Sequence, residues 1–311
     1  MKFRTEYTIP QDAPKPLQPE RLAILLGSCF SDNIGAKMLS SGWPALVNPC
    51  GVLYNPLSIC NLIDLALLPE EERSRRVKAS VIPREGKYVS WYASSSIAGS
   101  SSDECAGKML AALEELRRGL GEAQALLLTF GTADVWQLAD GGMVVGNCHK
   151  YPASSFEKRR LGIAEIVGKV RHTLNNIKSI NPDLQVILTV SPRRYLATGL
   201  ADNTLQKAPL LLACHELCSP VEPAGESENR EEITIKPGAG AMRISYFPAY
   251  EILNDDLRDY RFYSADLLHP SEMAVDYIWD CFTRTYLTDE ARSRLSAIAR
   301  ANRRQNHRPI L

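Results

Sequence analysis

Three side chains of this 311-residue chain have the types and surroundings that nucleophilic acyl chemistry needs. Ser28 directly follows an apolar run in the segment Gly27-Ser28-Cys29-Phe30, while Asp266 and His269 lie three residues apart near the other end. A serine becomes a nucleophile when an imidazole accepts its proton, and the imidazole needs a carboxylate on its other nitrogen. A three-residue spacing in a turn places the carboxylate of Asp266 and the imidazole of His269 on the same side of that turn. The set predicts Ser28 as nucleophile, His269 as base and Asp266 as its orienting group.

Each of these motifs also has a structural interpretation. Gly27 permits a sharp bend, and Ser28 can simply cap the helix that follows. His269 can mark a helix entry before Pro270, with the aspartate incidental. A structural role explains each motif taken alone. The combination favours catalysis, because a nucleophile requires a base and the base requires an orienting group.

Few other histidines compete for the role of base, since the chain has only five. His172 and His307 lie in polar stretches and are expected to face solvent, and His215 lies in a predicted helix. His149, in the segment Asn147-Cys148-His149-Lys150, has two readings: it contacts substrate, or it belongs to a structural turn held by the asparagine. Cys29 is expected to pack as a small hydrophobic residue.

Alternating apolar and amphipathic stretches predict the elements that position these residues. The predicted strands are Leu22–Leu26, Ala45–Val47, Ala125–Phe130, Leu184–Val190 and Arg243–Phe247. The predicted helices between them are Ser31–Ser40, Pro56–Leu68, Asp103–Leu120, Leu161–Ile180 and Asn203–Leu217, the last disturbed by Pro209. Continuous apolar strands that alternate with helices predict a doubly wound parallel sheet. Ligands of such sheets bind beyond the carboxyl ends of the strands, where Ser28 would lie.

The remaining segments predict smaller features of one domain that spans 1–311, with its core at about 20–287. Hairpins are expected at Val81–Trp91 and at Val135–Val145, the second turning at 139–142. The proline-rich residues 1–20 form an extended lead-in, and 219–231 form a surface loop. Residues 288–311 form a basic helix or tail that is solvated, the alternative being a nucleic-acid or partner contact.

Composition excludes several classes of function. Lys plus Arg and Asp plus Glu both number 36, which argues against a nucleic-acid or membrane-surface binder. No stretch approaches the roughly 18 apolar residues of a membrane helix. Charges close to Met1 leave no export signal, so we expect a cytoplasmic protein with reduced cysteines. Cys214-His215-x-x-Cys218 has no second ligand pair, so we expect no metal.

The motifs together resemble one family. Gly27-Ser28-Cys29-Phe30, Asp266-x-x-His269, NPCGVLYNP (48–56), GNCHKYP (146–152) and the long block at 246–279 resemble the GSCFA family, a branch of the SGNH (GDSL-like) hydrolases. The resemblance spans roughly 20–287. It implies a flavodoxin-like three-layer α/β/α sandwich with a five-stranded parallel sheet, to which the hairpins add small insertions.

The resemblance also implies roles for individual residues. Ser28, Asp266 and His269 match the family's triad, and the backbone N–H groups of Ser28 and Gly51 match its oxyanion hole. The asparagine expected after the third strand is missing from the segment 131–134, and one lost oxyanion donor can cost about 10²–10³ in rate. The substitutes, in order, are Thr132, Asn147 and Asn55. The residues expected to contact substrate are Asn55, Gly131, Asn147, His149 and Arg194.

The segment after the fourth strand departs from the family pattern. The pattern usually reads Ser-Pro-Val-Arg-His and then Asn-x-x-Ser-Lys, whereas this chain has Ser191-Pro192-Arg193-Arg194-Tyr195 and then the segment 203–207. Tyr195 replaces a histidine and Gln206 a serine, while Arg194, Asn203 and Lys207 match. The triad is unaffected, but the substrate need not be shared.

These observations predict a serine esterase or deacylase that needs no cofactor or metal and acts on a small-molecule or glycan acyl ester. O-acetylated carbohydrate is one substrate class by analogy. Two alternatives stay open: an acyltransferase that uses the same triad, and a binding module that has lost catalysis. The acyl group, the alcohol and the oligomeric state are not determined by the sequence.

Overall fold

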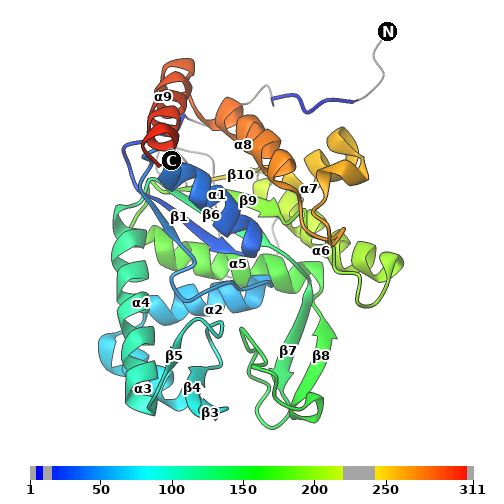
Figure 1. The fold of residues 1–311 in the computed structure, drawn as a ribbon. Helices are drawn as coiled ribbons and strands as arrows, with labels where there is room; N and C mark the ends of the chain where they lie inside the picture. Colours follow the sequence, from blue (N-terminus) through cyan, green and yellow to red (C-terminus); the bar gives the residue numbers. More distant parts are fainter. Residues whose placement is uncertain (1–4, 10–15, 220–241, 307–311) are drawn as a thin grey trace, which may run out of the picture.

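The protein is described here by a computed structural model covering residues 5–9, 16–219 and 242–306. Five parallel strands form the central sheet in the order β10-β9-β6-β1-β2. Their bounds are β1 Ala23–Gly27, β2 Ala45–Val47, β6 Ala125–Phe130, β9 Gln185–Val190 and β10 Arg243–Tyr246. Helices lie on both sides of this sheet (Figure 1). The predicted three-layer α/β/α architecture is confirmed, and each predicted strand is correct to within one residue at either end.

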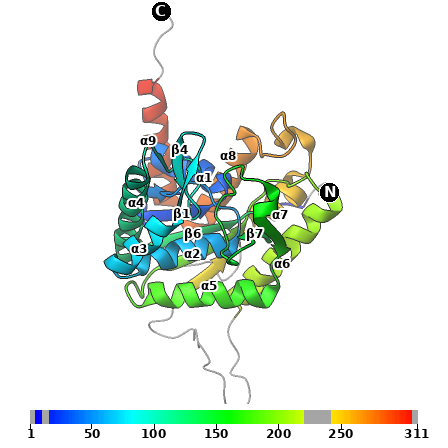
Figure 2. The same ribbon diagram turned by 90° about the horizontal axis from the view of Figure 1, so that it is seen from below.

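Two sets of helices cover the two faces of the sheet. One face carries α1 (Cys29–Ser40) and α8 (Glu272–Tyr286), beside which lies α9 (Asp289–Asn306). The opposite face carries α2 (Pro56–Leu67), α4 (Ser102–Glu122), α5 (Ile163–Lys178) and α6 (Leu200–Cys218). Figure 2 shows α2, α5 and α6 from this side. The shorter helices are α3 Glu70–Ser80, α7 Ala249–Glu251, the π-helix η2 Ile252–Leu257, and the 3₁₀ turns η1 Ala153–Ser155 and η3 Tyr260–Phe262.

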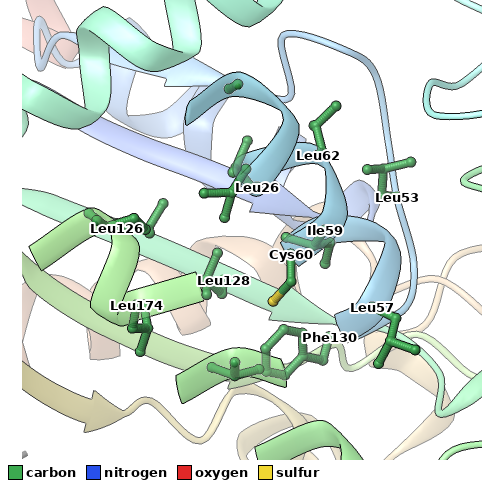
Figure 3. Packing of buried hydrophobic residues seen from close by; sticks show 14 of the residues in the cluster. Leu26, Leu53, Leu57, Ile59, Cys60, Leu62, Leu126, Leu128, Phe130 and Leu174 are labelled. Atoms are coloured by element: carbon green, nitrogen blue, oxygen red, sulfur yellow. The ribbon is translucent and has the colours of Figure 1, made fainter. Parts of the chain in front are cut away.

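The side chains of each strand alternate between two cores, because successive residues point to opposite faces. Ile24 and Leu26 of β1 pack on the side of α2 and α4, whereas Ala23 and Leu25 pack on the side of α1 and α8. Figure 3 shows the first core, in which Ile59 and Cys60 of α2 lie against Leu128 and Phe130 of β6. Burial on both faces explains why the strands are apolar without interruption.

Two small sheets lie below the central sheet in Figure 1. The first consists of β3 (Val81–Arg84), β4 (Lys87–Ser90) and β5 (Ala98–Gly99), which confirms the first predicted hairpin. In the second, β7 (Asp134–Leu138) pairs with β8 (Phe156–Arg160), which was not predicted. The predicted hairpin is present beside it: Gln137 and Val144 form an antiparallel bridge, with backbone hydrogen bonds from Leu138 to Met143 and from Val145 to Trp136, each of 2.9 Å. Trp91, Val145 and Phe156 form a separate buried cluster between the two small sheets.

Other segments differ from the sequence prediction or lie outside the described residues. α3 was not predicted, since its sequence EEERSRRVKAS buries only Arg73, Val77 and Ser80. α6 continues through Pro209. Almost the whole predicted loop at 219–231 and residues 10–15 of the predicted lead-in fall in the undescribed ranges. Within the described ranges, no helix has the length and apolar character needed to cross a membrane.

Candidate active site

Ser28 occupies the junction between β1 and α1, where it is completely buried. It caps α1, and its Oγ accepts a hydrogen bond from the N–H of Phe30 at 3.3 Å. Gly27 enters this junction with φ +138°, and a Cβ there would lie 2.2 Å from the carbonyl oxygen of Thr129. Only glycine fits this approach. The close contact between β1 and β6 therefore fixes the position of Ser28.

Hydrogen bonds from neighbouring strands hold this junction in place. The N–H of Ser28 donates to the Thr129 carbonyl at 3.2 Å, and the Ser31 hydroxyl donates to Thr129 Oγ1 at 2.8 Å. Asn48, after β2, accepts from the N–H of Gly27 at 2.9 Å. Its Nδ2 donates to Asp32 on α1 at 2.6 Å. The serine is thus anchored by three strand ends and one helix.

Asp266 and His269 lie in a short closed loop, residues 263–270. An antiparallel bridge pairs Tyr263 with Pro270 at its base, and the N–H of Ser264 donates to the His269 carbonyl at 2.8 Å. Inside the loop, Asp266 Oδ1 accepts from the N–H groups of Leu268 (2.9 Å) and His269 (3.0 Å). An aspartate that bonds backbone groups two and three residues ahead stabilises such a turn.

The carboxylate of Asp266 also contacts the imidazole directly, with Oδ2 2.5 Å from His269 Nδ1. Because a carboxylate only accepts, Nδ1 carries the proton, and Nε2 is left as an acceptor. Nε2 has no hydrogen-bond partner within the described ranges. The backbone N–H of His269, its imidazole and the N–H of Leu268 together hold the pKa of Asp266 well below its usual range. The pair therefore has the protonation that a general base requires.

Contacts with the segment after β9 hold this loop at the carboxyl rim of the sheet. The N–H of Arg194 donates to the Leu268 carbonyl at 3.0 Å, and its guanidinium lies 4.1 Å from the ring centre of Tyr263. β9 and β1 both pair with β6, so His269 and Ser28 belong to the same end of the sheet. No hydrogen bond joins Ser28 Oγ to His269 Nε2, however. The structure thus brings Asp266 and His269 into contact, but it leaves Ser28 without a hydrogen bond to His269.

The groups expected in the oxyanion hole have other partners in this structure. The N–H of Ser28 is bonded to Thr129, as described above, and the N–H of Gly51 donates to the Asn48 carbonyl at 2.7 Å. Thr132 Oγ1 donates to Gln206 Oε1 at 2.8 Å. The backbone N–H of Thr132 donates to the Tyr54 carbonyl. An oxyanion could use these donors only if they shared or changed their present acceptors.

The predicted substrate residues divide into two groups. Gly131 lies at the rim, where its N–H donates to the Tyr54 carbonyl at 2.7 Å, and Arg194 contacts the loop of residues 263–270. Asn55 caps α2 by accepting from the N–H of Ser58 at 2.8 Å. Asn147 accepts from the N–H of His149 at 2.7 Å. The amide oxygens of Asn55 and Asn147 thus serve local backbone groups.

His149 is buried in the cluster between the two small sheets. Its Nε2 lies 2.8 Å from the Ser90 carbonyl, and its Nδ1 lies 3.0 Å from Ser95 Oγ. Burial lowers its pKa, with the charge of Arg84 adding to the effect. A neutral ring that donates from Nε2 to a carbonyl satisfies both contacts. Of the two sequence readings, these contacts support the structural turn.

Lys207 is a site residue to which sequence reasoning assigned no role. It is 1% exposed, and its amine donates to the carbonyls of Gly131 (2.6 Å) and Ser191 (2.8 Å). It thus joins the chain segments that follow β6 and β9. Burial, together with the charge of Arg193, lowers its pKa to about 7. Its place inside the apolar run of α6 was the available signal, because lysine is almost never fully buried without a reason.

Comparison with known proteins identifies one family, and the similar solved structures include two esterases. A model of the GSCFA family matches residues 23–282. A carbohydrate esterase family 2 enzyme with a carbohydrate binding domain from Corynascus thermopiles (Myceliophthora fergusii) is 9% identical, with a TM-score of 0.36, over 91% of this chain and 69% of that one. An acetyl xylan esterase from the rumen bacterium Butyrivibrio proteoclasticus is 9% identical, with a TM-score of 0.37, over 86% of this chain and 65% of that one. No curated protein matches the sequence at a significant level.

Proposed function

The chain belongs to the GSCFA family, and on that premise we propose that it is a serine esterase or deacylase that forms an acyl-enzyme on Ser28. The observation that carries the proposal is the contact between Asp266 Oδ2 and His269 Nδ1 at 2.5 Å. In the neutral imidazole it makes Nε2 the acceptor, and no described residue forms a hydrogen bond with Nε2. A helix entry needs no such arrangement, whereas a general base does.

In the proposed reaction, His269 Nε2 takes the proton of Ser28 Oγ as the oxygen attacks the acyl carbon. The protonated imidazole, stabilised by Asp266, then gives this proton to the departing alcohol. Water repeats the two steps and releases the acid. The N–H groups of Ser28 and Gly51 are the donors proposed for the oxyanion.

Two rearrangements are part of this proposal. The Ser28 hydroxyl must leave the N–H of Phe30 and come within hydrogen-bond distance of Nε2, about 2.6–3.2 Å. The oxyanion donors must turn from the carbonyls of Thr129 and Asn48 toward substrate. Catalytic hydrogen bonds are often long before substrate binds and tighten in the complex.

The test is labelling by a fluorophosphonate probe together with turnover of 4-nitrophenyl acetate and of an O-acetylated xylan. We expect the wild type to be labelled and to turn over an ester, and Ser28→Ala to do neither. The matched control is Ser80→Ala, which removes a buried hydroxyl on α3 that has no part in the Ser28 junction. Equal labelling and turnover by wild type and Ser28→Ala would exclude the proposal.

A second variant separates the serine from the adjacent thiol. Burial raises the pKa of Cys29 and keeps it a thiol, while the charge of Arg193 opposes this shift. A neutral thiol is a poor nucleophile. We therefore expect Cys29→Ala to keep Ser28-dependent turnover, and loss of labelling in that variant would point to the sulfur instead.

Acyl transfer to a hydroxyl acceptor is the second candidate, and the complete burial of Ser28 favours it. A site that excludes water protects an acyl-enzyme from hydrolysis. The ratio of transfer to hydrolysis, measured while xylose or glycerol is titrated as acceptor, distinguishes the two reactions. A ratio of zero at every acceptor concentration would exclude transfer.

A further inference from the structure

Arg193 is a cation without a carboxylate partner at the rim beside Ser28. It forms no ion pair with any described acidic residue, and its buried Nε has no hydrogen-bond partner there. Its charge acts on the Cys29 thiol and the Tyr54 hydroxyl, lowering both pKa values against the effect of burial. Cys29 directly follows Ser28. The guanidinium therefore lies close to the proposed nucleophile.

Tyr195 provides a second polar group in the same place. Its ring lies 4.7 Å below the guanidinium of Arg193 and packs edge-on against Tyr54. Its buried hydroxyl interacts with the Arg193 side chain, but forms no hydrogen bond of normal geometry with any described residue. A Cβ on Gly131 would lie 2.8 Å from this oxygen, so the hydroxyl sits where β6 ends. Buried side-chain donors without a well-formed hydrogen bond are uncommon, and here Arg193 Nε and the Tyr195 hydroxyl lie together.

The backbone fixes this hydroxyl rather than leaving it mobile. The N–H of Tyr195 donates to Asn203 Oδ1 at 2.8 Å, which ties the segment after β9 to α6. The amine of Lys207, one turn further along α6, lies 5.2 Å from the Tyr195 ring centre. Among the described residues, the hydrogen-bond partners of this amine are the carbonyls of Gly131 and Ser191. A group held in this way is preorganised for a ligand.

The charges around this place do not balance. Among the described acidic residues, Asp32 is the one whose charge reaches the Cys29 thiol and the Tyr54 hydroxyl, raising both pKa values. Its carboxylate is already bonded by Asn48 Nδ2 at 2.6 Å. No ion pair joins this carboxylate to Arg193. A positive site with unused donors is suited to an anion.

We propose that the Ser28 site takes acyl esters that carry an anionic group, a carboxylate, phosphate or sulfate, which the Arg193 guanidinium and the Tyr195 hydroxyl bind. This inference rests on the proposed function and names its substrate class. The anion gives Arg193 Nε the acceptor it lacks and accepts the hydroxyl proton of Tyr195. It also offsets the positive charge of Arg193.

The test uses matched pairs of esters that differ in one anionic group. On the acyl side, mono-4-nitrophenyl succinate is compared with 4-nitrophenyl butyrate; on the alcohol side, 4-acetoxybenzoate is compared with phenyl acetate. We expect kcat/KM for the charged member of one pair to exceed that of the neutral member by about tenfold or more, since hydrogen bonds to charged groups contribute about 1.5–3 kcal/mol. In Arg193→Gln, which keeps a polar side chain but loses the charge, this preference falls below about threefold.

The matched control is Arg118→Gln, which removes an exposed charge from α4. This control keeps the wild-type preference. A wild type that prefers the neutral ester in both pairs, or an Arg193→Gln variant that keeps the full preference, overturns the inference. Tyr195→Phe gives an intermediate loss, because it removes one donor and no charge.

Direct binding separates this inference from the proposed function. Calorimetric titration of succinate and of inorganic phosphate into Ser28→Ala measures anion binding without any turnover. Binding that is at least about tenfold weaker in the Ser28→Ala, Arg193→Gln double variant supports the site, even if no ester is hydrolysed. No binding of either anion to Ser28→Ala overturns it, even if neutral esters are hydrolysed.

Discussion

The two halves of the candidate site are built in opposite ways. The serine half, made of Gly27, Ser28 and the ends of β1 and β6, is fully buried and held by neighbouring strands. The histidine half, the loop of residues 263–270, is partly exposed, with 44% of the Asp266 side chain and 37% of the His269 side chain accessible. Most of the hydrogen bonds that shape it start and end within the loop.

This difference separates stability from reactivity. A change in the serine half disturbs the packing of the sheet, so it alters the free energy of unfolding together with activity. A change in the histidine half removes few tertiary contacts, so it can alter activity alone. Substitutions in both halves test whether this separation holds.

The largest effect is expected for His269→Ala in the histidine half. Loss of the base lowers kcat by about 10⁴-fold, because removing one member of such a triad removes most of its catalysis. The free energy of unfolding changes by no more than about 0.5–1 kcal/mol, since the side chain is exposed. Ester turnover and urea unfolding check both parts. A loss of several kcal/mol in stability would break the separation.

The next effect is expected for Gly27→Ala in the serine half. The added Cβ would lie 2.2 Å from the Thr129 carbonyl oxygen, at a φ of +138° that alanine avoids. We expect the free energy of unfolding to fall by about 4 kcal/mol or more, among the largest values seen for single substitutions. Activity falls with it. Gly168→Ala is the control, because a Cβ there meets nothing within 4 Å; unchanged stability in Gly27→Ala would contradict the described junction.

The third prediction concerns pH and Lys207, which borders the serine half. Burial lowers its pKa from 10.5 to about 7, so between these values the unfolded chain binds a proton that the folded chain does not. Stability of the wild type therefore rises with pH in this window, relative to Lys207→Met, by roughly 3 kcal/mol between pH 7 and pH 9.5. Urea unfolding of both proteins at pH 7, 8 and 9.5 measures the difference. A difference that is constant with pH would mean that the amine keeps its proton.

The smallest effect is expected for Leu267→Gly, back in the histidine half. Leu267 has a φ of +58° and is 50% exposed, so it adopts a left-handed conformation without packing in return. Glycine relieves this strain but loses more entropy on folding, and we expect a net gain of at most about 1 kcal/mol. Turnover stays within about twofold. Thermal unfolding measures the change in stability. A large loss of activity would show that the leucine side chain itself contacts substrate.

The central sheet could be predicted because its strands carry a local signal. The continuous apolar runs at 125–130 and 184–190 require burial on both faces, and only the middle of a parallel sheet provides it. The contact between Asp266 and His269 could also be predicted, because the two residues are only three positions apart in the sequence. The structure confirms the sheet and brings these two side chains together.

The features that were mispredicted or missed depend on distant partners. Residues 139–142 form the predicted turn, but β7 also takes Phe156–Arg160 as a partner, and Arg160 Nε donates to Asp134 at 2.6 Å across that pair. α3 has few apolar residues, and its Arg73 bonds the Ala66 carbonyl and Glu114, far away in sequence. Periodicity within a segment carries no information about such contacts.

The expected oxyanion donors show the same limit of sequence-based prediction, here for individual hydrogen bonds. The resemblance to a family selects Ser28 and Gly51 by residue type and position. Which carbonyl faces each N–H depends on strand register and on the turn at Asn48. The sequence could therefore propose these two donors, but it held no information about their present acceptors.

The bridge between Tyr263 and Pro270 has a consequence for how a reactive centre could be completed. Because the loop is closed at its base, carboxylate and imidazole travel together, and the proton on Nδ1 keeps its place during any displacement. Because the carboxylate and the imidazole are already in contact, only the distance between Ser28 and His269 has to close, and not also the distance between His269 and Asp266. The entropy lost in aligning the carboxylate and the imidazole is therefore lost once, when the chain folds, and not again in every catalytic cycle.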